Sequence, residues 1–477
     1  MLFNSIDFAI FLPLVFALYW LLRDKLFLQN SLIAVSSYVF YGWWDWRFLF
    51  LIMCSTIVDY LIGRELDKSK VPFQRKVLLF ISIGVNLGLL GFFKYYNFFL
   101  DNFVDVFQFF GRDLNFRGLE IVLPVGISFY TFQTLSYTID IYRRKLEPTS
   151  NFIAFTAFVS FFPQLVAGPI ERATHLLPQF YTKRKFNYTM AVDGLRQILW
   201  GLFKKVVIAD NCAKFANEIF NNSDSFSGST LFLGAFFFAF QIYGDFSGYS
   251  DIAIGTSRLF GFDLMKNFAF PYFSRNVAEF WRRWHISLST WFRDYLYIPL
   301  GGSRGSSLQK VRNIFIIFIV SGFWHGANWT FIIWGALNAL YFLPLLLRNK
   351  NRIYTDTIAE DKVLPSIREL TQVFLTFLLT VIAWVFFRAE NLSHAFSFFN
   401  GMFSKTFFTI PEIRPTNLLI LISLFMIVEW FGRTEAFALS NIDKKMPRIV
   451  RYILYYTILL CLLYFAGAPQ EFIYFQF

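Results

Sequence analysis

Long apolar runs separated by short polar segments dominate the chain. Two of its early runs, Ile6–Leu22 and the shorter Phe48–Gly63, approach the roughly 20 residues that a membrane helix needs. Further runs of the same kind are Leu32–Trp44, Val77–Leu100, Ile121–Tyr142, Phe152–Val166, Val192–Ile219, Leu231–Phe260, Thr371–Phe387, Leu418–Phe431 and Ile449–Ala466. The pattern predicts an all-α, polytopic membrane protein with about 11 to 13 membrane segments, some of them re-entrant.

The segment Asn313–Leu347 contains no Lys, Arg, Asp or Glu over 35 residues. One straight helix of that length would extend roughly 50 Å, more than the ~30 Å hydrocarbon core requires. We therefore predict a break within Gly322–Asn328, where His325 lies. Ionisable residues at membrane depth are costly, so His325 is a functional candidate.

A second histidine, His285, lies 40 residues before His325. The surrounding segment Phe280–Tyr297 predicts an amphipathic helix, which could simply lie at the membrane interface with its apolar face in lipid. Its apolar residues recur at three- and four-residue steps: Trp281, Trp284, Leu288, Trp291 and Tyr295. His285 lies beside that stripe, so the two imidazoles could converge.

Polar residues also interrupt the apolar run Leu231–Phe260, between Gln241 and Asp251. We expect irregular backbone there, which at membrane depth is tolerated only where it is buried in protein or lines a cavity. The predicted cavity-wall residues are Asp245, Tyr249, Asp251, Trp324 and Asn328.

Composition supports a membrane protein, because 56% of the residues are hydrophobic and only 16% are charged, against about 25% in soluble domains. The net charge of +12 would suit a nucleic-acid-binding protein, but the basic residues lie in short loops such as Arg64–Lys76. This distribution fits the positive-inside rule, so we expect no nucleic acid as a partner. Charge alternation along the chain places both termini outside the cytoplasmic membrane, with the loop Arg433–Arg451 inside.

The sequence offers little support for a metal site or a serine hydrolase. Cys54, Cys212 and Cys461 are widely spaced, and the four histidines form neither HxxxH nor HExxH. No GxSxG elbow is present. We interpret His175, in a proline-containing polar segment, as an interfacial loop histidine.

A buried imidazole can serve several purposes. Burial favours the neutral form, which can take a proton from a hydroxyl that attacks an acyl carbonyl. His325 could also be a polar core residue or a proton relay in a transporter.

Four stretches of the sequence carry a family resemblance: FFPQLVAGPIER, GDFSGYSDIAIGTSRLFGF, FPYFSRNVAEFWRRWHISLSTWFRDYLYIPLGG and SGFWHGANWTFIIWG. They resemble the membrane-bound O-acyltransferase family, especially its bacterial branch of alginate and peptidoglycan O-acetyltransferases. The resemblance implies one transmembrane domain over residues 1–477 around a central funnel or tunnel, with a motif-dense catalytic core at 160–340.

The resemblance also implies a reaction. An acetyl group would pass from cytoplasmic acetyl-CoA to a hydroxyl outside, with His325 as general base and His285 orienting substrate or stabilising the oxyanion. Plausible partners for the CoA phosphates are Arg282, Arg283, Arg304, Lys310 and Arg312. No metal is expected, and an extracytoplasmic partner acyltransferase of the SGNH type would complete the transfer to a polysaccharide.

The last residues, Phe472–Phe477, are similar to the C-terminal tyrosine motif of the small peptide that works with the teichoic-acid D-alanylation acyltransferase. By this resemblance Tyr474, on a predicted external tail at 468–477, would carry the acyl group between donor and acceptor. The alternative is an aromatic tail anchored at the interface.

The reading that combines these features is a membrane O-acetyltransferase for a cell-surface polysaccharide or peptidoglycan. One alternative is an acyltransferase for a lipid, a small molecule or a protein. The other is a transporter that uses His325 as a proton relay.

Overall fold

The computed structural model describes residues 1–114, 116, 118–467, 470 and 472–473. Its described part consists of helices and connecting segments, without strands, and this confirms the predicted all-α class. The chain divides into two compact units, Met1–Ala191 with Thr256–Met265, and Val192–Gly255 with Lys266–Phe477. Each unit is described by itself below.

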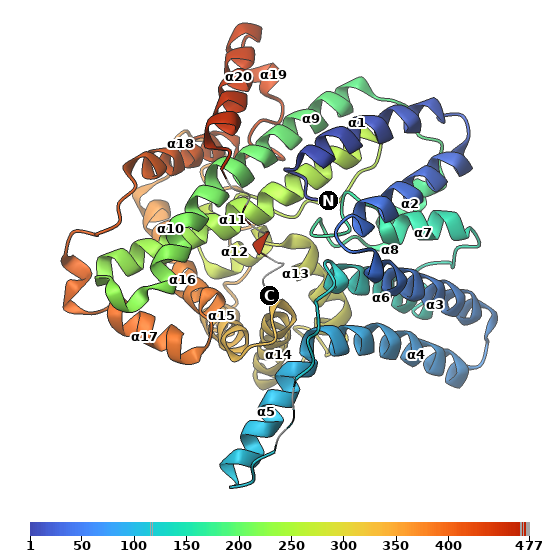
Figure 1. Ribbon diagram of the computed structural model, residues 1–477, viewed down its shortest axis with the longest axis horizontal. Coiled ribbons are helices and arrows are strands. Elements are labelled where there is room, and N and C mark those ends of the chain that lie inside the picture. Colours follow the sequence, from blue (N-terminus) through green and yellow to red (C-terminus); the bar gives the residue numbers. More distant parts are fainter. Residues whose placement is uncertain (115, 117, 468–469, 471, 474–477) are drawn as a thin grey trace. The chain divides into compact units, whose positions relative to one another are not determined.

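The first unit is a helical bundle with a polar network in its interior. Its helices are α1 (Ile6–Leu21), α2 (Leu26–Gly42), α3 (Leu49–Lys68), α4 (Pro72–Leu90), α5 (Tyr96–Phe109), α6 (Ile127–Tyr142), α7 (Phe152–Ser160) and α8 (Ala173–Leu176). Helices α3, α4 and α6 lie side by side (Figure 1). Between α3 and α4, the buried Asp59 carboxylate accepts hydrogen bonds from Ser82 Oγ at 2.6 Å and Asn86 Nδ2 at 2.8 Å. These donors satisfy a carboxyl that would otherwise be costly to bury.

The remaining helices belong wholly or mostly to the second unit, whose core is strongly aromatic. They are α9 (Tyr188–Leu202), α10 (Asp210–Asn221), α11 (Gly228–Leu259), α12 (Val277–Arg283), α13 (Ile286–Phe292), α14 (Ser307–His325), α15 (Trp329–Leu347), α16 (Ile367–Arg388), α17 (Leu392–Met402), α18 (Thr416–Gly432), α19 (Ile442–Lys445) and α20 (Arg448–Phe465). The rings of Trp284, Trp334 and Trp384 are fully buried at its centre.

Six helical segments among the described residues are long and apolar enough to cross a membrane: Trp46–Lys68, Pro72–Phe109, Gly228–Leu259, Trp329–Leu347, Ile367–Arg388 and Arg448–Phe465. Two shorter apolar helices, α1 and α18, add to them. Other predicted runs form shorter or interrupted helices. The run Phe152–Val166 is helical only to Ser160, and Val192–Ile219 contains a π-helical segment at Phe203–Ala209.

The predicted break in the long uncharged run is confirmed. Helix α14 ends at His325, and α15 begins at Trp329, after Asn328 caps it by accepting a hydrogen bond from the Thr330 amide at 3.0 Å. The two helices lie side by side (Figure 1). Gly322 allows this approach, because a Cβ there would strike the backbone carbonyl oxygen of Phe331.

The prediction of one amphipathic helix over Phe280–Tyr297 is wrong. Helix α12 ends at Arg283 and α13 starts at Ile286, because His285 adopts the left-handed conformation with φ 43° and ψ 54°. A left-handed residue cannot continue a right-handed helix. The expected irregular backbone at Gln241–Asp251 is also wrong, since α11 runs without interruption through those positions. Its polar side chains instead project from a regular helix.

Candidate acyl-transfer site

The two histidines singled out by the sequence converge in the second unit. Their ring centroids are 6.4 Å apart, and the residues are 1% and 3% exposed for His285 and His325. Both line a cavity of about 460 Å³ that helices α12, α13, α14 and α15 help to form. Two buried imidazoles thus face one space that is large enough for part of a substrate.

Aromatic rings hold the imidazole of His325 in place. The Trp334 and Phe387 rings each lie 5.3 Å from it, and Trp324 lies 4.9 Å away on the same helix. His325 is the last residue of α14, because the helix breaks directly after it. This apolar enclosure restricts water around the imidazole, which strengthens electrostatic interactions with a bound substrate.

Asn267 fixes the orientation of His285. Its Oδ1 lies 3.0 Å from His285 Nδ1 and accepts a hydrogen bond from Ser287 Oγ at 2.9 Å, while its Nδ2 donates to Ser250 Oγ at 3.0 Å. The carbonyl of Asn267 also accepts a hydrogen bond from the Ile286 amide at 2.9 Å. Because an amide oxygen only accepts, this network assigns the proton of His285 to Nδ1.

Cationic side chains also line this cavity. Arg282, Arg293 and Arg352 line it, and among its described lining residues none is acidic. Arg282 donates to the Asn351 carbonyl at 2.7 Å, and Arg293 pairs with Asp294 at 2.7 Å. Arg352 is exposed and has no ion-pair partner within the described part of the chain. An anionic group bound in this cavity would meet positively charged side chains in the same space as the two histidines.

Of the cations predicted to bind CoA phosphates, only Arg282 lines this cavity. Arg283 pairs with Glu279 at 2.9 Å and donates to the Asp356 carbonyl at 2.8 Å. Arg304 and Arg312 are exposed and Lys310 is half-buried. Their role stays a prediction.

The predicted cavity-wall residues all belong to the second unit, and none of them lines the 460 Å³ cavity. Asp251 pairs with Lys204 at 2.6 Å, and Asn328 donates to the Glu390 carbonyl at 2.7 Å. Tyr249 is buried with its ring 4.9 Å from that of Phe472, and Trp324 packs against the histidines, 6.1 Å from His285.

Asp245 connects this region to the end of the chain. Its carboxylate pairs with Lys205 at 2.8 Å and accepts a hydrogen bond from the Ile473 amide at 2.7 Å. Lys205 also donates to the Gln470 carbonyl at 3.2 Å and pairs with Asp210 at 2.9 Å. A buried ion pair therefore binds the backbone of the C-terminal segment on both sides of residue 471.

The C-terminal segment approaches His285 through one intervening ring. Phe246 lies 4.6 Å from the His285 ring and 6.3 Å from the ring of Phe472. Phe472 and Ile473 are 2% and 1% exposed, so these residues pack into the second unit. The predicted relay residue Tyr474 lies outside the described residues.

His175 belongs to the first unit. It lies in the short helix α8 and is partly exposed. Its Nδ1 pairs with the buried Glu171 carboxylate at 2.7 Å. The hydrogen bond to Glu171 raises the pKa of His175. Burial raises the pKa of Glu171, whose other oxygen accepts a hydrogen bond from the Met265 amide.

Sequence reasoning missed Asn267, Lys204, Lys205 and Arg352. The lysine pair had a usable signal, because adjacent cations inside the apolar run Val192–Ile219 require anionic partners. Asn267 had no such signal, since its importance depends on contacts with residues far along the chain. Among the described residues, no group of three or more His, Cys, Asp or Glu side chains could hold a metal ion.

Comparison with known proteins assigns the chain to a family. A family model described as the membrane-bound O-acyltransferase family matches residues 142–348. The probable alginate O-acetylase AlgI of Pseudomonas aeruginosa is 41% identical over 455 residues, which cover 94% of this chain and 84% of that protein. The peptidoglycan O-acetyltransferase of Helicobacter pylori is 37% identical over 433 residues, covering 84% and 80%. The teichoic acid D-alanyltransferase of Bacillus subtilis is 28% identical over 233 residues, covering 46% and 58%.

The helical architecture and these matches define a multi-pass membrane enzyme that transfers acyl groups to hydroxyls. The chain belongs to the membrane-bound O-acyltransferase family. The predicted family, fold class and enzyme class are thereby confirmed.

Proposed function

We propose that this enzyme moves an acetyl group from cytoplasmic acetyl-CoA to a hydroxyl of a cell-surface polysaccharide, alginate-like or peptidoglycan-like. The observation that carries the proposal is the pair of buried imidazoles, 6.4 Å apart, on one cavity that also has cationic side chains. The names of the relatives from P. aeruginosa and H. pylori support an acetyl donor and a polymeric acceptor.

In this proposal the cavity receives the pantetheine end of acetyl-CoA, and the phosphates of CoA bind to the positively charged side chains that line the cavity. Arg282, Arg293 and Arg352 supply that charge. Arg352 belongs to the connection between α15 and α16, whose charge pattern predicts a cytoplasmic loop. Acetyl-CoA would therefore enter the cavity from the cytoplasm.

The proposed first step is transfer to Tyr474. His325 takes the proton of the tyrosine hydroxyl, and the phenolic oxygen attacks the thioester carbonyl. The carbon–sulfur bond breaks, and the CoA thiolate leaves and takes the proton from the imidazolium. The products are an acetyl-tyrosine ester and free CoA. His285, whose proton is on Nδ1 against Asn267, keeps Nε2 as a hydrogen-bond acceptor, which would orient the substrate for this step.

Two features support a role for the tail. Asp245 and Lys205 bind the backbone at Ile473 and Gln470, and Tyr474 follows Ile473 directly in the sequence. Binding the nucleophile within the protein makes the attack intramolecular, an advantage of proximity. An extracytoplasmic partner acyltransferase would then move the acetyl group from the ester to the polymer. In this arrangement the enzyme lies in the cytoplasmic membrane with both termini outside.

Mass spectrometry of the C-terminal peptide tests the relay. Purified enzyme in lipid nanodiscs, incubated with isotopically labelled acetyl-CoA, should carry the label on the peptide that contains Tyr474. The variants Tyr474→Phe and His325→Ala should not. A C-terminal peptide that stays unmodified during turnover, with Tyr474→Phe fully active, would refute the relay.

A pair of arginine variants tests the donor site. Arg352→Gln should raise KM for acetyl-CoA about fivefold with little change in kcat, because a charge-assisted contact to phosphate is worth roughly 1 kcal/mol at a partly solvated site. Arg312→Gln removes another exposed charge, one that does not line the cavity, so KM should not change. An increase with Arg312→Gln alone would place the phosphates at the other predicted cations.

A further inference from the structure

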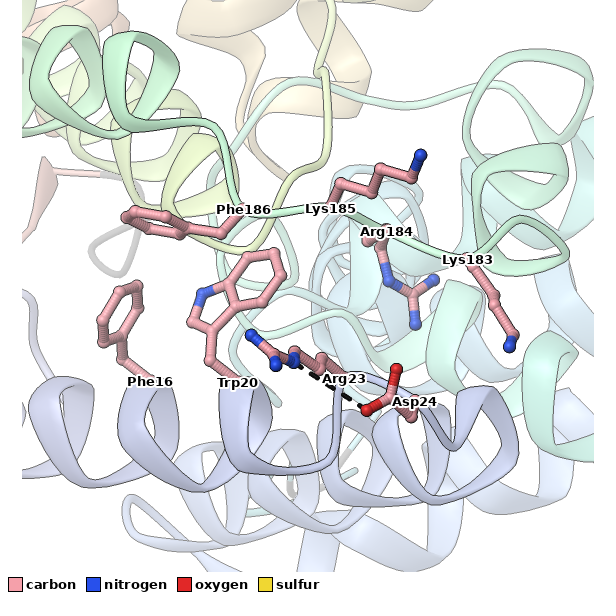
Figure 2. A pocket seen from close by; sticks show the side chains of 8 residues that line it. All are labelled: Phe16, Trp20, Arg23, Asp24, Lys183, Arg184, Lys185 and Phe186. Carbon is pink, nitrogen blue, oxygen red and sulfur yellow. Dashed lines mark ion pairs between the residues drawn. The ribbon is translucent and has the colours of Figure 1, made fainter.

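A second cavity, of about 640 Å³, lies in the first unit and has no part in the proposed acyl transfer (Figure 2). Its walls come from the C-terminal half of α1 with the two residues that follow Leu22, and from residues 183–186. Figure 2 shows aromatic rings gathered at one end and cationic side chains at the other. The cavity thus combines two chemically different halves.

The aromatic half consists of Phe16 and Trp20 on α1 and Phe186 on the facing segment. The Phe186 ring lies 6.1 Å from Phe16 and 5.3 Å from Trp20, and the residue is 51% exposed. The Trp20 Nε1 donates to the Leu259 carbonyl at 3.1 Å, which fixes the indole. A tryptophan at the end of an apolar helix is typical of the boundary between hydrocarbon and water.

The lipid-facing side of α1 supports this location. Ile10, Leu14 and Leu18 are 58%, 60% and 50% exposed along the same helix, and charged residues begin at Arg23. At 3.6 residues per turn these three residues project about 140° away from Phe16 and Trp20, so they do not line the cavity. They show that α1 carries exposed apolar surface up to its charged end.

The cationic half contains Arg23, Lys183, Arg184 and Lys185 against one acidic residue, Asp24. Within the described part of the chain, neither Lys183 nor Lys185 has an ion-pair partner. Arg23 contacts only its exposed neighbour Asp24, at 3.8 Å, a geometry that contributes little.

Arg184 differs from the other cations because it is buried, at 7% exposure. It donates to the Gln179 carbonyl at 3.0 Å and to Asn30 Oδ1 at 2.7 Å. Its buried Nε has no hydrogen-bond partner among the described residues. A buried donor without an acceptor is costly, so an acceptor oxygen from a ligand would stabilise the site.

We propose that this cavity binds the headgroup of an anionic phospholipid. The phosphate accepts hydrogen bonds from Lys183 and Arg184, Lys185 adds positive charge from the other side of the segment, and the first carbons of the acyl chains pack on Phe16, Trp20 and Phe186 (Figure 2). Basic pockets beside membrane helices bind anionic headgroups in this way. A soluble phosphate would use the cations but would gain nothing from the aromatic end, and for this reason we assign a lipid.

Native mass spectrometry of the purified full-length protein tests the proposal. The protein in detergent is titrated with phosphatidylglycerol, phosphatidylcholine or glycerol phosphate, and bound adducts are counted. We expect phosphatidylglycerol adducts, with weak binding of the other two. The double variant Lys183→Gln/Lys185→Gln should bind phosphatidylglycerol roughly 30-fold more weakly, about fivefold for each charge removed. Phe186→Ala should also weaken it.

The matched control is Lys68→Gln/Lys70→Gln, which removes two exposed charges at the C-terminal end of α3 in the same unit. Its binding of phosphatidylglycerol should equal that of wild type. Equal weakening in the control, equal binding of phosphatidylcholine, or binding of glycerol phosphate as tight as that of the lipid would each overturn the proposal.

Discussion

Removing the carboxylate charge of Asp245 should release the C-terminal segment. In Asp245→Asn the Ile473 amide loses a charged acceptor at 2.7 Å, and Lys205 loses one of its two carboxylate partners. A hydrogen bond to a charged group contributes about 1.5–3 kcal/mol, so the equilibrium for release of the segment should rise roughly 10- to 100-fold. Lys205 keeps Asp210, so the protein should still fold.

Hydrogen–deuterium exchange measures that equilibrium at the Ile473 amide. We expect exchange there to accelerate by the same factor in Asp245→Asn, and acetyl transfer to fall as the docked fraction falls. Asp251→Asn is the matched control, because Asp251 lies on α11 with Asp245 but pairs with Lys204, so its substitution weakens an ion pair that does not bind the tail. It should lower thermal stability but leave Ile473 exchange unchanged. Unchanged exchange in Asp245→Asn would refute the proposed role of Asp245.

Three further predictions follow from the contacts described. Gly322→Ala should lower the melting temperature, since the added Cβ meets the Phe331 carbonyl and overpacking costs about 1–3 kcal/mol. A melting temperature equal to that of wild type would contradict the close approach of the two helices. Asn267→Ala should lower kcat roughly 10- to 100-fold with little change in KM, because His285 loses its orienting partner; equal kcat would exclude that role. The pKa of His175 is raised in the folded state, so its pairing with Glu171 should stabilise the protein below pH ~6.5 and lose effect as pH rises through the folded pKa. Melting temperatures of wild type and His175→Gln should therefore differ more at pH 6 than at pH 8.5, and a constant difference would contradict the assignment.

The sequence was informative where composition and length restrict the backbone. An uncharged run too long for one helix requires a break, and the structure has that break directly after His325. Periodicity was misleading at His285, because the apolar spacing of Phe280–Tyr297 fits a continuous helix. The left-handed turn at His285 depends on Asn267, whose contacts no local pattern reveals.

The polar residues of α11 illustrate a similar limit. Carboxylates in an apolar run predict buried cationic or hydrogen-bonding partners, but the positions of the carboxylates in the sequence do not identify the partner residues. The partners, Lys204 and Lys205, lie on a separate π-helical segment, which approaches α11 closely at Gly248. Pairing of Asp245 with the C-terminal backbone requires a long-range fold that a linear pattern does not specify.

The central claim is that His325 promotes acyl transfer from a thioester, and purified enzyme tests it most directly. Release of CoA from acetyl-CoA and acetylation of the acceptor should be measured for wild type and His325→Ala in the same membrane mimic. Loss of a general base predicts a rate about 10²–10⁴-fold lower for the variant, with an unchanged melting temperature. Full activity of His325→Ala, or a wild-type protein that transfers no acyl group but drives pH-dependent ion flux, would contradict the account.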